Sequence, residues 1–97
     1  MNVLNEGKRP VLIISNNYEN LLDVVTIIPI TSLKKNRRVY PNEFLLQHEL
    51  EKPSILLCQQ IRTILKQRLV KRLTIINNPY TRKEIIEILC QRFEEIE

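Results

Sequence analysis

The sequence predicts a mainly β fold, a small and highly curved antiparallel barrel that ends in one α-helix, within a single domain spanning residues 1–97. Short apolar runs rich in β-branched residues recur through the first 76 residues, and Asn, Pro and Gly separate them. The last part of the chain instead places apolar residues at steps of three and four. With 97 residues, of which 43% are hydrophobic and 27% charged, the chain can bury one core without a metal or a disulfide.

The first predicted strand covers residues 11–15, a continuous apolar run. Pro10 precedes it and has no amide donor, which suits the first residue of an edge strand. Lys8 and Arg9 follow a predicted turn at Gly7 and lie at the mouth of this strand. They either face an anionic ligand at that rim or are solvated charges that close the turn.

Further strands are predicted for residues 24–30, 43–47, 54–59, 62–64 and 73–76, with one helical turn at residues 66–69. Pro29 indicates an edge or a bulge near the end of the second strand. Between the second and third strands, four of the five residues at 34–38 are cationic. Such a charge run is typical of a solvated loop.

The C-terminal helix is predicted to begin with a capping box, because Thr81 and Glu84 have the required spacing. An apolar stripe follows at helical spacing, formed by Ile85, Ile86, Leu89, Phe93 and Ile96. We expect this stripe to pack on the sheet.

Net charge and composition indicate the kind of partner and the cellular compartment to expect. The formal charge of +4 and a pI near 9.3 favour an anionic partner such as nucleic acid. Cys58 and Cys90 lack CxxC spacing and are expected to be reduced, buried thiols, which indicates a cytoplasmic protein. No signal peptide, membrane span, metal-binding cluster or cofactor motif is predicted, and His48, the only imidazole, is expected to be solvated.

Four motifs in order resemble the MazF/PemK family of toxins. They are "EGKRPVLIIS", "TIIPITS", the "YP" at Tyr40 and Pro41, and "KPSILLCQQIRTILKQRL". The resemblance implies an SH3-like barrel with a C-terminal helix that forms a homodimer. It also implies the toxin component of a type II toxin–antitoxin system, an endoribonuclease that cuts single-stranded RNA without a metal and is neutralised by a cognate antitoxin.

The family's catalytic positions fall on Arg9 and Thr31. An arginine fork matches two phosphate oxygens, and a threonine hydroxyl can donate to a third or orient an attacking 2′-hydroxyl. Thr31 could instead cap a turn. Because a guanidinium keeps its proton, charge stabilisation suits Arg9 better than proton donation. Other expected RNA-binding residues are Lys8, Ser32, Lys34, Lys35, Arg37, Arg38, Gln59, Gln60 and Arg62.

The resemblance also predicts a deficit at the N-terminus. Family members carry a first strand and a Glu-Gln loop before the Arg-Pro motif, whereas this sequence has only "MNVLNE" there, with Leu4 and Asn5 at the Glu-Gln places. We therefore expect the first strand to be missing. This expectation leaves a second function open, a catalytically impaired relative that binds RNA or antitoxin without cutting.

Overall fold

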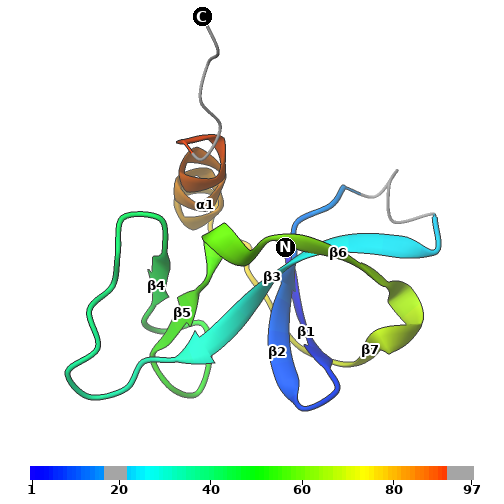
Figure 1. Ribbon diagram of the computed structural model, residues 1–97, viewed down its shortest axis with the longest axis horizontal. Coiled ribbons are helices and arrows are strands. Elements are labelled where there is room, and N and C mark those ends of the chain that lie inside the picture. Colours follow the sequence, from blue (N-terminus) through cyan, green and yellow to red (C-terminus); the bar gives the residue numbers. More distant parts are fainter. Residues whose placement is uncertain (17–21, 92–97) are drawn as a thin grey trace, which may run out of the picture.

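The computed structural model describes residues 1–16 and 22–91, which form an antiparallel sheet and one helix (Figure 1). The strands are β1 (Asn2–Glu6), β2 (Arg9–Ile13), β3 (Val24–Ser32), β4 (Phe44–Leu46), β5 (Ser54–Leu56), β6 (Arg62–Leu65) and β7 (Leu69–Ile75). Two 3-10 turns, η2 (Cys58–Gln60) and η3 (Lys66–Arg68), flank β6, and helix α1 covers Pro79–Gln91. The predicted class, a mainly β antiparallel fold with a C-terminal helix, is confirmed.

The sheet curls because its longest strand, β3, changes partner along its length. The strand order is β4-β5-β3-β2-β1-β7, and β6 also pairs with β3. The first half of β3, from Val24 to Ile27, pairs with β6, while Ile30 to Ser32 pairs with β5. Pro29 lies between these two pairings, where its missing donor interrupts neither ladder. No pairing between β4 and β7 closes the sheet in the described residues.

The expectation of a missing first strand is wrong. Residues Asn2–Glu6 form β1, which pairs with β2 on one side and with β7 on the other. Only Val3 and Leu4 of its five residues are apolar, which is too short a run to predict a strand, and only Val3 is fully buried. Pairing with two neighbours, rather than intrinsic propensity, defines this strand.

A two-residue turn joins β1 to β2, since Glu6 and Arg9 are the last paired residues of the hairpin. Gly7 in this turn has φ of +63°, in the left-handed region that glycine adopts without strain. The predicted turn at Gly7 is thus confirmed, but the edge position of Pro10 is wrong. β2 lies inside the sheet, and Pro10 pairs only with Asn5 of β1 because pairing with β3 starts one residue later, at Val11.

Several predicted boundaries also shift. The strand expected at residues 54–59 ends at Leu56, and the chain turns into η2. The helical turn expected at 66–69 is η3, and the last strand begins four residues early, at Leu69. The third predicted strand shortens to Phe44–Leu46 because Glu43 is taken up in a turn.

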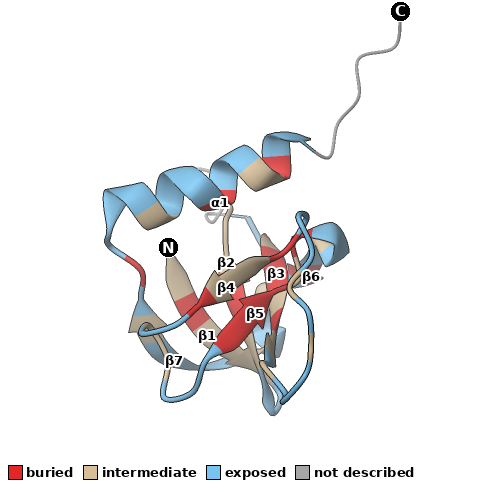
Figure 2. Cartoon of the chain, turned by 90° about the vertical axis from the view of Figure 1, so that its left-hand side faces the viewer, coloured by how far each residue is buried: buried red, intermediate tan, exposed pale blue. Residues whose placement is uncertain are grey.

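The core consists of two clusters on opposite faces of the curved sheet. In β3, Ile28 and Ile30 belong to the larger cluster, which α1 covers, and Val25 and Ile27 belong to the smaller one. This alternation follows from the two-residue period of a strand. Figure 2 shows α1 lying across one end of the strands, with buried residues along β5 below it.

Helix α1 begins earlier than its predicted capping box. The Asn78 side-chain oxygen accepts hydrogen bonds from the amides of Tyr80 and Thr81, at 2.9 and 3.4 Å, so Asn78 is the N-cap. Pro79 then occupies the first helical position, where its missing donor costs nothing. Thr81 is therefore inside the helix, and the prediction of Thr81 as cap is wrong.

The predicted apolar stripe is only partly correct. Ile85 and Leu89 are buried against the sheet, whereas Ile86 is 43% exposed. Phe93 and Ile96 lie outside the described residues. The cysteine prediction is also half right, because neither cysteine is in a disulfide and Cys58 is buried in η2, but Cys90 is exposed on α1.

Candidate active site

A pocket of about 480 Å³ opens where β2, β3, η2 and β6 meet. Five of the residues predicted from the sequence line it: Arg9, Thr31, Ser32, Gln60 and Arg62. Each comes from near the end of its element, so segments far apart in sequence converge at one rim. The remaining lining residues are Glu6, Pro10, Val11, Pro29, Ile30, Ser54 and Leu57.

The pairing of β2 with β3 brings Arg9 and Thr31 to the same pocket. Val11 pairs with Pro29, and the strands are antiparallel. This is the last pair between the two strands, and Arg9 and Thr31 lie two residues beyond it on their own strands, where both line the pocket. Pro10 fixes the backbone next to Arg9. The two predicted catalytic residues thus line one pocket.

Both side chains are available to a ligand. Within residues 1–16 and 22–91, neither the Arg9 guanidinium nor the Thr31 hydroxyl has a hydrogen bond or an ion pair. A guanidinium fork and a hydroxyl are donors that match the oxygens of a phosphodiester. The pocket can therefore hold an anionic, phosphate-sized group.

Arg62, by contrast, has a partner inside the protein. Its Nη2 donates to Oε1 of Glu6 at 2.7 Å, and Nη2 of Arg68 lies 2.9 Å from the other Glu6 oxygen. Glu6 is thus a lining residue of the pocket whose charge two arginines neutralise. Sequence patterns did not identify Glu6 as a site residue, although it directly precedes Gly7 and the two cations at the start of β2.

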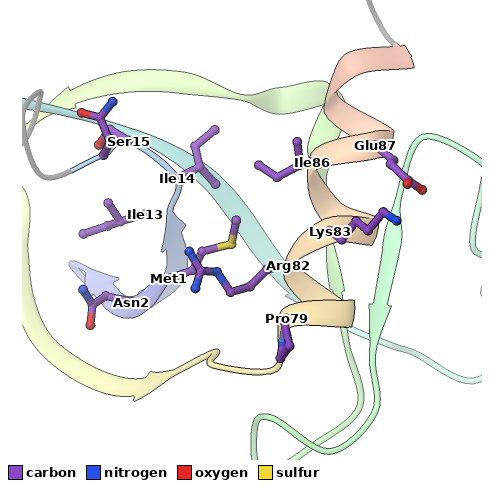
Figure 3. A pocket seen from close by; sticks show the side chains of 11 residues that line it. Met1, Asn2, Ile13, Ile14, Ser15, Pro79, Arg82, Lys83, Ile86 and Glu87 are labelled. Carbon is purple, nitrogen blue, oxygen red and sulfur yellow. The ribbon is translucent and has the colours of Figure 1, made fainter.

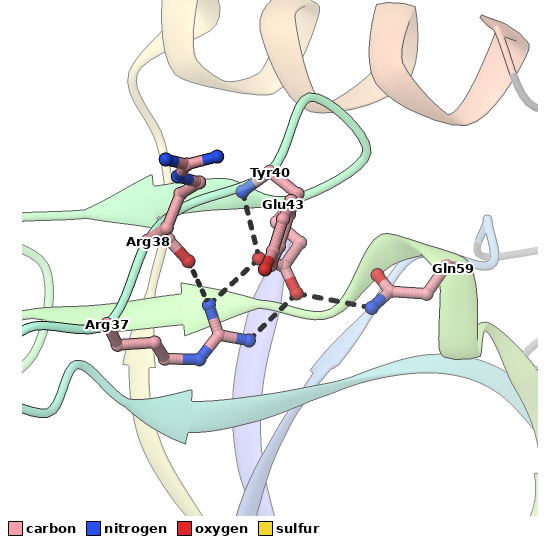
Figure 4. Close-up of polar contacts among 5 residues, drawn as sticks. All are labelled: Arg37, Arg38, Tyr40, Glu43 and Gln59. Carbon is pink, nitrogen blue, oxygen red and sulfur yellow. Dashed lines mark hydrogen bonds and ion pairs between the residues drawn. The ribbon is translucent and has the colours of Figure 1, made fainter.

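Arg37 and Gln59 do not line the pocket; they converge on Glu43 instead (Figure 4). The Glu43 side chain is only 2% exposed, and Arg37 binds both its oxygens at 2.9 Å. The amide of Tyr40 and the side-chain amide of Gln59 also donate to it, at 3.1 and 3.2 Å. This network ties the 34–43 loop to η2.

The hydrogen bonds from Arg37, with those from Tyr40 and Gln59, outweigh burial and lower the pKa of Glu43 to about 2. The same ion pair raises the pKa of Arg37. Glu43 is therefore charged throughout the neutral range and acts as a structural anchor. The sequence pattern placed this residue in a strand, where its burial and its partners could not be seen.

The remaining predicted RNA-binding cations lie outside the pocket lining. Lys8 is exposed in the β1–β2 turn, and Lys34, Lys35 and Arg38 are exposed on the loop after β3. Asn36 in this loop has φ of +68°, a conformation that asparagine tolerates better than most residues. The loop cations are exposed and none of them lines the pocket.

A larger pocket of about 690 Å³ lies between α1 and the N-terminal strands (Figure 3). Ile86 of α1 flanks it on one side, Ile13 and Ile14 lie on the other, and Arg82 and Lys83 are at its rim. None of the predicted site residues lines it. Its size alone does not make it the reactive site, because neither Arg9 nor Thr31 is among its lining residues.

Residues 1–16 and 22–91 contain neither a metal-binding cluster nor a membrane-spanning helix. No group of three or more His, Cys, Asp and Glu side chains gathers there in a way that could hold a metal ion. No helix in this part of the chain has the length and apolar character needed to cross a membrane.

Several solved structures share the fold of this chain. The chain is similar to the solved Mycobacterium tuberculosis toxin MazF-mt6, with a TM-score of 0.78 and 22% identity, over 94% of each chain. It is also similar to a mycobacterial endoribonuclease in complex with its cognate antitoxin, with a TM-score of 0.77, 24% identity and coverage of 93% and 88%. For MazF of the MazE–MazF complex from Deinococcus radiodurans, these values are 0.73, 22%, 94% and 88%.

The family follows from the sequence itself. Residues 4–93 match the family model described as the PemK-like, MazF-like toxin of type II toxin–antitoxin systems. The chain therefore belongs to this family, and the resemblance seen in its motifs is confirmed.

Proposed function

We propose that this chain is the toxin of a type II toxin–antitoxin pair and cuts single-stranded RNA at the pocket between β2 and β3. The observation that carries the proposal is that Arg9 and Thr31 line one pocket and that their side-chain donors have no protein partner in the described residues. Membership of the family supports the same function.

The reaction we propose uses the RNA's own 2′-hydroxyl. Its oxygen bonds to the adjacent phosphorus, the bond from phosphorus to the 5′-oxygen breaks, and the hydroxyl's proton leaves while the departing oxygen gains one. The products are a 2′,3′-cyclic phosphate and a 5′-hydroxyl. Arg9 offsets charge that grows on the phosphoryl oxygens, and Thr31 donates to a phosphoryl oxygen or orients the hydroxyl.

Around this pair, Ser32, Gln60 and Arg62 are proposed contacts to flanking phosphates or base edges, because they line the same pocket. Gln59 is proposed to act only through its bond to Glu43, which fixes the turn that carries Gln60. The exposed cations Lys8, Lys34, Lys35 and Arg38 supply a sequence-independent attraction for the RNA backbone.

The loop cations give a salt prediction. Replacing Lys34 and Lys35 with Gln should reduce the log–log salt slope of single-stranded RNA binding by roughly 1.4, because each phosphate that a lysine neutralises adds about 0.7 to the slope. The measurement is a binding titration over a range of salt concentrations. The matched control is Arg82→Gln with Lys83→Gln on α1, which removes the same charge away from the site. Equal salt slopes for the two double variants would show that Lys34 and Lys35 are solvated and do not neutralise RNA phosphates.

A relative that binds RNA without cutting it is the second candidate. Its main support is gone, since β1 is present and paired on both sides. What still favours it is the pair Leu4 and Asn5, which stand where the family's Glu-Gln pair is expected.

One assay separates the two functions. A fluorogenic RNA incubated with the purified chain in EDTA should be cut, and Thr31→Ala should cut it more slowly. Binding of the same RNA, followed by anisotropy, is measured in parallel. Binding without cleavage would favour the second candidate, and neither binding nor cleavage would reject both.

We also propose a cytoplasmic protein with an antitoxin partner. Two of the similar structures are complexes of a toxin of this fold with its antitoxin, which supports a protein partner for this chain. Cys58 and Cys90, which are not in a disulfide, fit a reducing compartment.

A homodimer is expected because β7, at one end of the sheet, leaves apolar side chains uncovered. Val70 is 73% exposed and Leu73 is 42% exposed on this strand. Light scattering at micromolar concentration should give twice the mass of the chain, and Val70→Lys should weaken the association. A monomer mass for the unmodified chain would contradict this expectation.

A further inference from the structure

Glu6 joins β1 to β6, which does not pair with β1 in the described residues, and to Arg68, which directly precedes Leu69, the β7 partner of Glu6. It ends β1, and its two carboxylate oxygens contact Arg62 of β6 and Arg68 of η3 at 2.7 and 2.9 Å. β1 pairs with β2 and β7 but not with β6 in the described residues. The Glu6 side chain is 9% exposed, so this ion pair is well shielded on the carboxylate side.

The ion pair with Glu6 restricts the orientation of the Arg62 side chain at the pocket. The Arg62 side chain is 48% exposed and would otherwise sample many rotamers. With Nη2 held by Glu6, its other donors remain for a ligand, and the pocket lining includes both residues. Arg68 is not a lining residue, so it balances the carboxylate from outside.

Glu6 also leaves Arg9 free. The two residues are the cross-strand pair that closes the β1–β2 hairpin, so an acidic residue at this place could capture Arg9. Both Glu6 oxygens instead contact Arg62 and Arg68, and Arg9 keeps its fork unpaired within the described residues. The Glu6 carboxylate thus holds Arg62 in place and leaves the Arg9 guanidinium without a protein partner within the described residues.

We propose that Glu6 is a positioning residue that aims Arg62 at an RNA phosphate next to the one held by Arg9, an inference that rests on the proposed function. Glu6 does not touch the RNA in this arrangement and acts through Arg62. Oε1 of Glu6 accepts a hydrogen bond from Arg62, and the buried Oε2 has the ion-pair contact with Arg68 but no hydrogen bond, so the charge of both arginines favours the ionised carboxylate over a protonated one.

The test is a double-mutant cycle on kcat/KM for RNA cleavage. Glu6→Gln keeps the shape of the side chain and removes its charge, and it should lower kcat/KM about 10-fold to 100-fold. Arg62→Gln should do the same, and the double variant should be no worse than Arg62→Gln alone. Glu87→Gln, on α1, is the matched control and should change nothing.

Two results would overturn the proposal. Additive effects in the cycle would show that Glu6 does not act through Arg62, and disappearance of the acidic limb of the pH profile in Glu6→Gln would make it a base. Glu6→Asp, which retains the charge with a shorter reach, takes the place of Glu6→Gln if that variant does not fold. Should the unmodified chain cut nothing, the same cycle on binding of 2′-O-methyl RNA decides the role of Glu6 separately from catalysis.

Discussion

Arg9→Lys should slow RNA cleavage about 100-fold to 1,000-fold, the typical effect when a preorganised charge stabiliser is removed. Lysine keeps the charge but not the planar fork, so it cannot donate to two phosphoryl oxygens together. The structure favours Arg9 for this role because Pro10 and the buried strand behind it fix its backbone. Single-turnover cleavage of a fluorogenic RNA in EDTA measures the effect.

The matched control is Lys8→Gln, which removes the neighbouring cation from the exposed turn. Its effect should be confined to RNA affinity and should fade with added salt. RNA binding by Arg9→Lys, measured in the same buffer, should stay close to that of the unmodified chain. If Arg9→Lys cuts as fast as the unmodified chain, Arg9 is only a solvated charge at the mouth of β2.

Arg37→Ala should lower the melting temperature by about 10 °C, the second large effect. The substitution leaves the Glu43 carboxylate buried without its counter-ion, and only Tyr40 and Gln59 still donate to it. Glu43→Gln should cost less, because Arg37 is partly exposed and can turn to solvent. Removing the carboxylate charge as well, in Arg37→Ala with Glu43→Gln, should recover part of the stability.

The dependence of stability on acidic pH tests the ion pair between Arg37 and Glu43. The pKa of Glu43 is lowered from about 4.5 to about 2 in the folded protein, so its stabilising effect is complete above pH 4.5 and is lost as the pH falls toward 2. The stability advantage of the unmodified chain over Arg37→Ala should therefore shrink in that range. An advantage that does not change between pH 5 and pH 2 would contradict the assignment.

Strands with strong apolar runs could be predicted from sequence, and strands defined by their neighbours could not. β2 and β3 contain "VLI" and "VVTIIPI", and both were located to within two residues at either end. β1 reads "NVLNE", with one fully buried residue, and it exists because β2 and β7 pair with it. Local propensity is a weak guide where tertiary pairing decides.

The residues of the site also fall into two groups, those that sequence motifs predicted and those that only the folded structure reveals. Arg9 and Thr31 were predicted from motifs, and the pairing of β2 with β3 brings both to one pocket. The adjacent Gln59 and Gln60 could not be told apart in sequence, yet η2 turns one to Glu43 and the other to the pocket. Glu6 and Glu43 were missed because a buried carboxylate is recognised by its partners, which come from distant segments.

The ends of the RNA fragments test the proposed chemistry most directly. A long single-stranded transcript is digested with the unmodified chain in EDTA, and the fragment termini are identified by mass spectrometry. Attack by the 2′-hydroxyl predicts 5′-hydroxyl ends and 2′,3′-cyclic phosphate ends, absent from a parallel digest with Arg9→Lys. An intact transcript, or fragments that carry 5′-phosphates, would contradict cleavage by the Arg9 and Thr31 pocket.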